Sequence, residues 1–125
     1  MALSLTYPEG AALVAGGTGH VGEGVVRCLA KADLPVVFTY NRGADRAHAL
    51  ESDLRSAGHT VRAVQMALTD GGSIDAAISA AQELGRGRMH TVISTGGPMI
   101  PFAWIADVDE QALEQFMAED AMGAF

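Results

Sequence analysis

The stretch AGGTGHVG, Ala15 to Gly22, decides the fold, because half of its residues are glycines and it follows the apolar run AALVA directly. Its glycines fit two spacings, GxxGxxG at Gly16, Gly19 and Gly22, and GxGxxG at Gly17, Gly19 and Gly22. Glycine allows a turn with positive φ and lets the backbone approach a pyrophosphate without a Cβ in the way. A helix starting there offers its free N–H groups and dipole to an anion. Glycines can also serve only to close a strand–helix turn, so the rest of the chain must decide.

Strand-like and helix-like segments alternate along the sequence. We expect strands at 11–15, 36–40, 60–66 and 91–94. Helices are expected at 23–32 and 44–57, after a cap at Ser73, and after a capping box formed by Asp107 and Glu110. Such alternation predicts an α/β fold with a parallel sheet and helices on both faces. Ligands of these sheets bind at the carboxyl ends of the strands, so residues directly after each strand are the candidates for function.

Length and composition set the broad class of the protein. A chain of 125 residues predicts a single domain, 1–125, with its own core. The net charge of −7 and the single lysine, Lys31, argue against a nucleic-acid partner. No apolar run reaches the ~18 residues of a membrane helix, and the N-terminus lacks signal-peptide character, so we expect a soluble, cytoplasmic protein with no membrane partner. The lone Cys28 cannot form an internal disulfide, and we expect it to pack in the core.

The loop after the second predicted strand bears on the choice of cofactor. A dinucleotide fingerprint usually has an acidic residue about 20 positions after the glycines, where it binds the ribose 2′-hydroxyl. Here Asn41 and Arg42 stand at that point, with no acid between Asp33 and Asp45. A guanidinium can bind the 2′-phosphate of NADP, which a carboxylate would repel. The sequence therefore favours NADP(H) over NAD(H), with an ordinary exposed arginine at a helix start as the alternative.

The same loop disfavours two other kinds of phosphate site, a Walker A loop and a phosphorylatable receiver. A Walker A loop would need GK[ST], which is absent; Thr18 and His20 occupy the variable positions instead. His20 can donate to a phosphate or be a solvated loop residue. Flavodoxin-like and response-regulator-like folds share the alternation of strands and helices, but a phosphorylatable receiver needs acids where this chain has Ala15 and Gly16.

From Leu13 to Phe125 the chain resembles the short-chain dehydrogenase/reductase family. The segment VVFTYNRGADRAHALESDLRSAG, residues 36–58, is similar to the second strand and helix of NADP-dependent members such as 3-oxoacyl-carrier-protein reductases. The resemblance implies a Rossmann fold with strand order 3-2-1-4 and hydride transfer between NADP(H) and a carbonyl or alcohol substrate. It implies cofactor contacts from Gly16, Thr18, Gly19, His20, Val21, Gly22, Asn41, Arg42, Leu68, Ser94, Thr95 and Gly96.

Several positions differ from the family's pattern. Ala67 stands where the family usually has an Asp that binds the adenine amino group, while Leu68 would still flank the adenine. The family's NNAG is replaced by STGG at residues 94–97, whose short side chains still admit the cofactor. Asp120 takes the place of an Asn that supports a proton-relay water, although a carboxylate cannot donate as an amide does.

The family's catalytic Ser and Tyr-x-x-x-Lys have no counterpart in this sequence. Tyr7 and Tyr40 are each followed four residues later by alanine. We therefore expect the cofactor-binding half of an NADP(H)-dependent oxidoreductase, ending within its last helix and inactive alone. An open edge strand and exposed apolar helix faces predict a homo-oligomer. The alternatives are a non-catalytic nucleotide-binding or regulatory module that dimerises through its open edge, and an unrelated α/β interaction domain.

Overall fold

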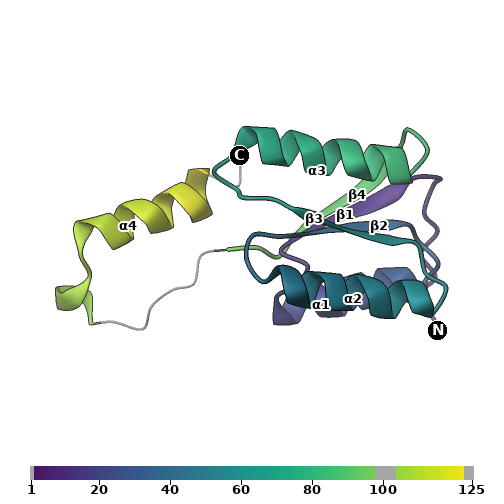
Figure 1. The fold of residues 1–125 in the computed structure, drawn as a ribbon, viewed down its shortest axis with the longest axis horizontal. Coiled ribbons are helices and arrows are strands. Elements are labelled where there is room, and N and C mark those ends of the chain that lie inside the picture. Colours follow the sequence, from purple (N-terminus) through teal and green to yellow (C-terminus); the bar gives the residue numbers. More distant parts are fainter. Residues whose placement is uncertain (1, 98–103, 123–125) are drawn as a thin grey trace.

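The computed structural model describes residues 2–97 and 104–122, in which strands and helices alternate (Figure 1). The elements are β1 (Ala11–Ala15), α1 (His20–Lys31), β2 (Val36–Tyr40), α2 (Ala44–Ser56), β3 (Val61–Gln65), α3 (Gly71–Leu84), β4 (Met89–Ser94), the 3-10 helix η1 (Ile105–Asp107), α4 (Glu110–Phe116) and the π-helical segment η2 (Met117–Met122). All four predicted strands are present, with ends within two residues of the expected ones.

The four strands form one parallel sheet in the order β3-β2-β1-β4. Leu13 of β1 stands between Val37 of β2 and Val92 of β4, which fixes the register across the centre of the sheet. Every residue of β1 is buried, as expected for a strand covered on both faces. The predicted α/β class and the strand order 3-2-1-4 are confirmed.

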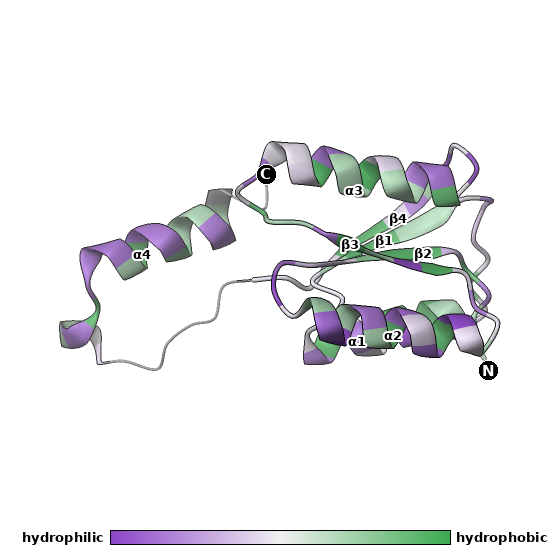
Figure 2. Ribbon diagram, in the orientation of Figure 1, coloured by the Kyte–Doolittle hydropathy of each residue, from purple (hydrophilic) through white to green (hydrophobic). Residues whose placement is uncertain are grey.

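Helices cover the sheet on both sides, with α1 and α2 on one face and α3 on the other (Figure 1). Because side chains alternate along a strand, β1 contributes Val14 to the apolar cluster under α1 and α2, and Leu13 to the cluster under α3. Phe38 of β2 belongs to the first cluster and is fully buried. Figure 2 shows apolar residues in the strands and a mixture of apolar and hydrophilic residues along these helices. The core is thus two apolar layers separated by the sheet.

Helix α1 differs from its prediction in both start and orientation. It begins at His20, three residues before the expected Glu23, and buries Gly22, Val26, Leu29 and Ala30. Gly22 lies directly against the backbone oxygen of Gly16, and this contact sets the rotation of the helix about its axis. Cys28 is consequently exposed, and the prediction that it packs in the core was wrong.

Two predicted helix caps were also misplaced. The N-cap of α3 is Asp70, whose carboxylate accepts from the N–H of Gly72 at 3.1 Å; Ser73 instead bonds to the backbone of Ala67. The N-cap of α4 is Asp109, whose carboxylate accepts from the N–H of Ala112. Asp107 lies in η1, because a short 3-10 turn intervenes before α4. In both cases an acidic residue near the predicted cap has the extended backbone that an N-cap requires.

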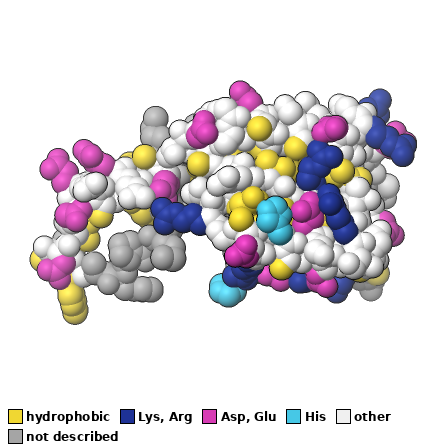
Figure 3. Space-filling view, viewed as in Figure 1, with side chains coloured by type: hydrophobic (Ala, Val, Ile, Leu, Met, Phe, Trp, Pro, Cys, Tyr) yellow, Lys and Arg dark blue, Asp and Glu magenta, His cyan; other side chains and the backbone are white. Residues whose placement is uncertain are grey.

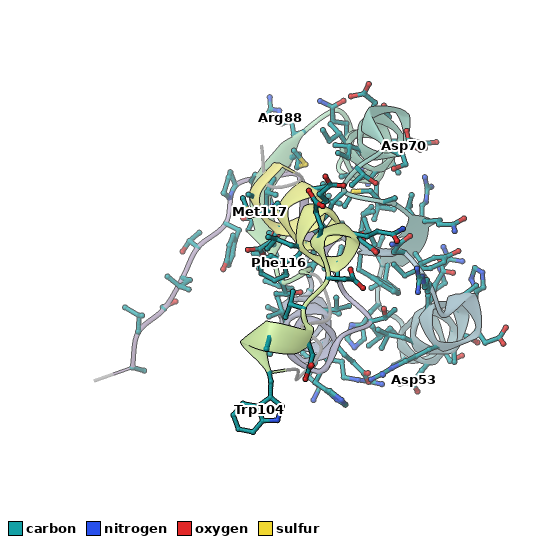
Figure 4. All side chains as sticks on the ribbon, turned by 90° about the vertical axis from the view of Figure 1, so that its left-hand side faces the viewer. Asp53, Asp70, Arg88, Trp104, Phe116 and Met117 are labelled. Carbon is teal, nitrogen blue, oxygen red and sulfur yellow. The ribbon has the colours of Figure 1, made fainter. Side chains whose placement is uncertain are left out.

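The β4 side of the sheet is only partly covered. Helix α3 contacts β1, β2 and β3, and Val92 in the middle of β4 is 60% exposed. On α4 and η2, Leu113 and Met117 are about half exposed. Figure 4 shows Trp104 projecting away from the neighbouring elements. Exposed apolar side chains are thus found at the β4 edge and around α4, and also at Leu3, Leu5 and Val21.

Candidate functional site

A cleft of about 250 Å³ opens at the carboxyl ends of the strands, where all four strands end next to one another. Residues following each strand contribute to its walls, together with one residue of η2. The lining residues are Ala15, Gly16, Thr18, Gly19, Thr39, Tyr40, Asn41, Met66, Leu68, Thr69, Thr95, Gly96, Gly97 and Glu119. The position agrees with the sequence argument that functional residues follow the strands.

The glycines after β1 are required by close packing. Gly16 has φ of 77°, and a Cβ on it would lie 2.5 Å from the backbone nitrogen of Gly96. A Cβ on Gly17 would lie 2.5 Å from the Cβ of Phe38 in the core. Gly22 lies so close to Gly16 that a side chain there would collide with the Gly16 oxygen. Because no side chain intrudes at Gly16, Gly19 and Gly96, the cleft is lined by backbone at this point.

The N-terminus of α1 supplies hydrogen-bond donors next to the cleft. Gly19 is the N-cap and lines the cleft, and the first helical bond runs from the N–H of Glu23 to the Gly19 oxygen at 2.8 Å. The N–H groups of His20, Val21 and Gly22 precede that bond, and no side-chain hydrogen bond caps the helix. With the positive end of the helix dipole, this arrangement can hold an anion.

Two threonines fix the glycine loop from neighbouring strands. Thr95 donates from Oγ1 to the backbone oxygens of Ala15, at 2.9 Å, and Gly16, at 3.2 Å. Thr39 is 1% exposed, and its Oγ1 accepts from the N–H of Gly16 at 3.2 Å. The Thr39 backbone oxygen also accepts from the N–H of Gly17 at 2.9 Å. These hydrogen bonds give the loop a defined shape.

The loop after β2 brings a polar and an aromatic residue to the cleft. Asn41 and Tyr40 line the wall, and the Tyr40 ring contacts the ring of His48 edge-on, with centroids 5.9 Å apart. Arg42 is exposed and outside the cleft walls. It takes part in none of the ion pairs found among residues 2–97 and 104–122. Arg42 directly follows the cleft-lining Asn41 in the chain.

The loops after β3 and β4 complete the walls. One wall of the cleft is formed by apolar and hydroxyl-bearing side chains, those of Met66, Leu68 and Thr69. The part of the wall that follows β4 includes Gly96 and Gly97, which have no side chain. The Ser73 hydroxyl holds the first of these loops by accepting from the Ala67 N–H at 3.0 Å and donating to the Asp70 oxygen at 2.8 Å.

The structure brings seven of the twelve predicted cofactor residues into the cleft walls. They are Gly16, Thr18, Gly19, Asn41, Leu68, Thr95 and Gly96. His20, Val21, Gly22, Arg42 and Ser94 lie outside the walls; Val21 is 70% exposed and Gly22 is buried against Gly16. Asp120 is exposed, with its carboxylate 3.9 Å from where a Cβ on Gly97 would lie.

Seven lining residues were not among the predicted site residues. They are Ala15, Thr39, Tyr40, Met66, Thr69, Gly97 and Glu119. Ala15 and Tyr40 end a strand and Met66 directly follows one, so the position of the strand ends would have identified these three. Glu119 carried no such signal, because it reaches the cleft from η2.

Charged residues link the first turns of α1 and α2. Glu23 accepts from Arg27 Nε and from Arg46 Nη2, both at 3.1 Å, and Arg27 also pairs with Asp53 at 2.7 Å. The hydrogen bonds from Arg46 and then Arg27 hold the pKa of Glu23 below its ordinary value of 4.5. Acidic side chains gather over α4 (Figure 3), in keeping with the negative net charge.

Neither a metal-binding cluster nor a membrane-spanning helix is present in the part of the chain that the structure describes. No group of three or more His, Cys, Asp or Glu side chains there could hold a metal ion. None of the helices in residues 2–97 and 104–122 combines the length and apolar character needed to cross a bilayer.

Comparison with known proteins identifies the fold family. A sequence profile described as short chain dehydrogenase matches residues 10–125. No curated protein sequence matches the chain. Among solved structures, a short-chain dehydrogenase/reductase from Serratia marcescens BCRC 10948 is similar with 26% identity and a TM-score of 0.82, covering 93% of this chain and 46% of its own.

Two further solved structures are similar over the same region. A blue fluorescent protein from a metagenomic library, in complex with NADPH, has 25% identity and a TM-score of 0.78, covering 91% of this chain and 46% of its own. A 3-ketoacyl-ACP reductase from Sinorhizobium meliloti 1021 shares the fold, with 20% identity and a TM-score of 0.81, covering 92% of this chain and 44% of its own. This chain thus spans about half the length of these proteins. It belongs to the short-chain dehydrogenase family and has the Rossmann-type fold of that family's oxidoreductases.

Proposed function

We propose that the cleft binds NADP(H) in preference to NAD(H). The chain would then be the cofactor-binding part of an oxidoreductase that transfers hydride between NADP(H) and a carbonyl or alcohol substrate. The observation that carries the proposal is the uncapped N-terminus of α1, which meets the cleft at Gly19 behind a loop kept free of side chains. A structural neighbour solved in complex with NADPH supports the same assignment.

The residues present fit a dinucleotide. A Cβ on Gly16 would fill the space against Gly96, so this cradle depends on glycine, and the N–H groups at the start of α1 would hold the pyrophosphate. Leu68 and Met66 offer apolar surface to the adenine, and Asn41 and Arg42 would bind the ribose and its 2′-phosphate. Thr95 and Gly96 would border the nicotinamide half. The cofactor, when bound, supplies or accepts the hydride.

The roles that we propose for residues of this chain are binding and positioning of the cofactor. Tyr40 lines the cleft but is followed at the fourth position by Ala44, and the single lysine, Lys31, ends α1. A tyrosine hydroxyl that serves as a general acid or base near neutral pH needs a cationic neighbour. The proposed role of the chain is therefore to hold the cofactor, in a cleft that Glu119 lines and Asp120 approaches near Gly97.

Titration of the intact protein with NADPH and NADH by calorimetry tests the proposal. We expect saturable binding of both, with NADPH at least about tenfold tighter because of the charge-assisted bonds to its 2′-phosphate. Arg42→Asp should weaken NADPH binding strongly and NADH binding little. Arg86→Asp makes the same charge change in the turn before β4, at the opposite end of the sheet, and should leave both unchanged. Absence of saturable binding would overturn the proposal, and tighter binding of NADH would overturn the preference.

A second candidate function is a nucleotide-binding module that assembles through its β4 edge. The observation in its favour is Val92, which is 60% exposed on an edge strand of the sheet. Light scattering on the intact protein should then give a homo-oligomer, and Val92→Lys should shift it toward the monomer while NADPH binding is retained. A monomer in the wild type would exclude this assembly.

A further inference from the structure

The first turn of α2 carries a second arginine near the proposed 2′-phosphate site. Arg46 is the third residue of α2 and lies four positions after Arg42. Its Nη2 atom reaches across to α1 and donates to Glu23 Oε2 at 3.1 Å. The Arg46 side chain is 52% exposed and the Glu23 side chain 28% exposed, so the pair lies at the surface. The guanidinium is therefore held at the junction of the first turns of α1 and α2.

This junction adjoins the proposed cofactor site on both sides. Glu23 lies one turn after Gly19, which lines the cleft. The N–H of Glu23 donates the first hydrogen bond of α1 to the Gly19 oxygen. Asn41, which also lines the cleft, lies three residues before Ala44, the first residue of α2. A phosphate on the ribose, bound after β2, would lie between these two helix starts. Arg42 and Arg46 are the two cationic side chains that the described loop after β2 and first turn of α2 provide.

Glu23 orients the Arg46 guanidinium and partly neutralises its charge. Glu23 also accepts from Arg27, which is bound in turn by Asp53, so its carboxylate is fixed from a second side. A guanidinium has five N–H donors, and one carboxylate bond leaves others for a phosphate. A phosphate monoester carries more negative charge than a carboxylate and would compete well for the group.

We propose that Arg46 is a second binding residue for the 2′-phosphate of the dinucleotide, and that Glu23 is the positioning residue that holds it and limits its charge. The inference rests on the proposed function. It makes selectivity between phosphorylated and unphosphorylated ribose depend on two helices rather than on the loop after β2 alone. Removing the charge of Arg46 should therefore weaken binding of the 2′-phosphate, and removing the charge of Glu23 should strengthen it.

The test compares Arg46→Gln and Glu23→Gln in the intact protein, with NADPH, NADH, adenosine 2′,5′-bisphosphate and AMP as probes in calorimetry. Arg46→Gln should weaken the binding of NADPH and of the bisphosphate by about five- to tenfold, and should leave the affinities for NADH and AMP unchanged. Glu23→Gln retains an oxygen that can orient Arg46 but removes the competing charge, so it should strengthen the two phosphorylated probes by a few-fold. In the double variant the gain from Glu23→Gln should disappear.

Arg62→Gln is the matched control, because Arg62 makes an exposed ion pair of 2.8 Å with Glu83, between β3 and α3. It should lower no probe's affinity. If Arg46 and Glu23 only brace α1 against α2, both variants will change the affinities for all four probes by the same factor, which would overturn the inference. If the wild type binds NADPH selectively and Arg46→Gln keeps that selectivity, the inference alone fails. If the wild type binds no dinucleotide, the proposed function fails with it.

Discussion

Thr95 Oγ1 donates a hydrogen bond of 2.9 Å to the backbone oxygen of Ala15, a residue 80 positions earlier in the chain. The same hydroxyl reaches the Gly16 oxygen at 3.2 Å, and the Thr95 N–H also bonds to Ala15. The end of β4 is thereby tied to the glycine loop that follows β1. A single side chain thus couples the two sides of the cleft.

Thr95→Val should loosen this connection without changing the size of the side chain. Loss of the hydroxyl bonds is expected to lower the free energy of unfolding by about 1 kcal/mol, measured by urea denaturation. Because the glycine loop is then less well held, NADPH affinity should also fall. Thr95→Ser keeps the hydroxyl and should recover most of both losses. Equal stability of the Val variant and the wild type would contradict the role given to this bond.

Gly16→Ala should damage the fold itself. The residue has φ of 77°, and the added Cβ would lie 2.5 Å from Gly96 nitrogen, so strain and collision add together. We expect a loss of about 3 kcal/mol or more in the free energy of unfolding. Gly24→Ala is the matched control, because that glycine is helical and a Cβ there meets nothing within 4 Å.

The free energy of unfolding of the Gly24→Ala control should rise rather than fall. Replacing a helical glycine by alanine reduces the freedom of the unfolded chain, so Gly24→Ala is expected to gain about 0.5–1 kcal/mol. If both variants were destabilised equally, the close contact of Gly16 with Gly96 would not explain the glycine loop.

The sheet could be predicted from the sequence because short apolar runs alternated with helical patterns. AALVA and VVFTY are bounded by turn residues, and their strands begin and end at the predicted positions. The glycine loop was predicted for the same reason, since glycine at fixed spacing after a strand has a recognisable role. Local pattern was sufficient for these elements.

Other features depended on contacts between distant parts of the chain. The rotation of α1 is set by Gly22 against Gly16, which exposed Cys28 contrary to the helical pattern. Thr39 supports the loop from a neighbouring strand, and a buried threonine in a strand carries no sign of that role in the sequence. Glu119 reaches the cleft from η2, far along the chain. Tertiary packing, rather than local preference, decided these positions.

Ser73→Ala should affect the loop that carries Leu68 and Thr69 into the cleft. The hydroxyl accepts from the Ala67 N–H at 3.0 Å and donates to the Asp70 oxygen at 2.8 Å. Its removal leaves a part-buried N–H without this partner, so we expect a loss of about 1–2 kcal/mol in the free energy of unfolding. NADPH affinity should fall as the loop becomes less ordered. Ser79→Ala, exposed on the same helix, should leave both quantities nearly unchanged.

Protonation of Glu23 should lower the free energy of unfolding as the solution becomes acidic. Hydrogen bonds from Arg46 and Arg27 hold the pKa of Glu23 in the folded protein below its ordinary value of 4.5. As the pH falls, the unfolded chain therefore takes up this proton first, and stability rises with pH across the interval between the two pKa values. The contribution of Glu23 is fully present above its ordinary pKa and is lost as the pH falls through the lowered one.

Urea denaturation between about pH 3 and pH 7 measures this contribution. Glu23→Gln should be less stable than the wild type near neutral pH, and the difference should shrink toward the acid end of the range. Glu9→Gln is the matched control, because Glu9 is exposed and forms no ion pair among the described residues. It should follow the wild-type curve. A Glu23→Gln curve parallel to the wild type at every pH would show that the bonds from Arg46 and Arg27 do not act through the ionised carboxylate.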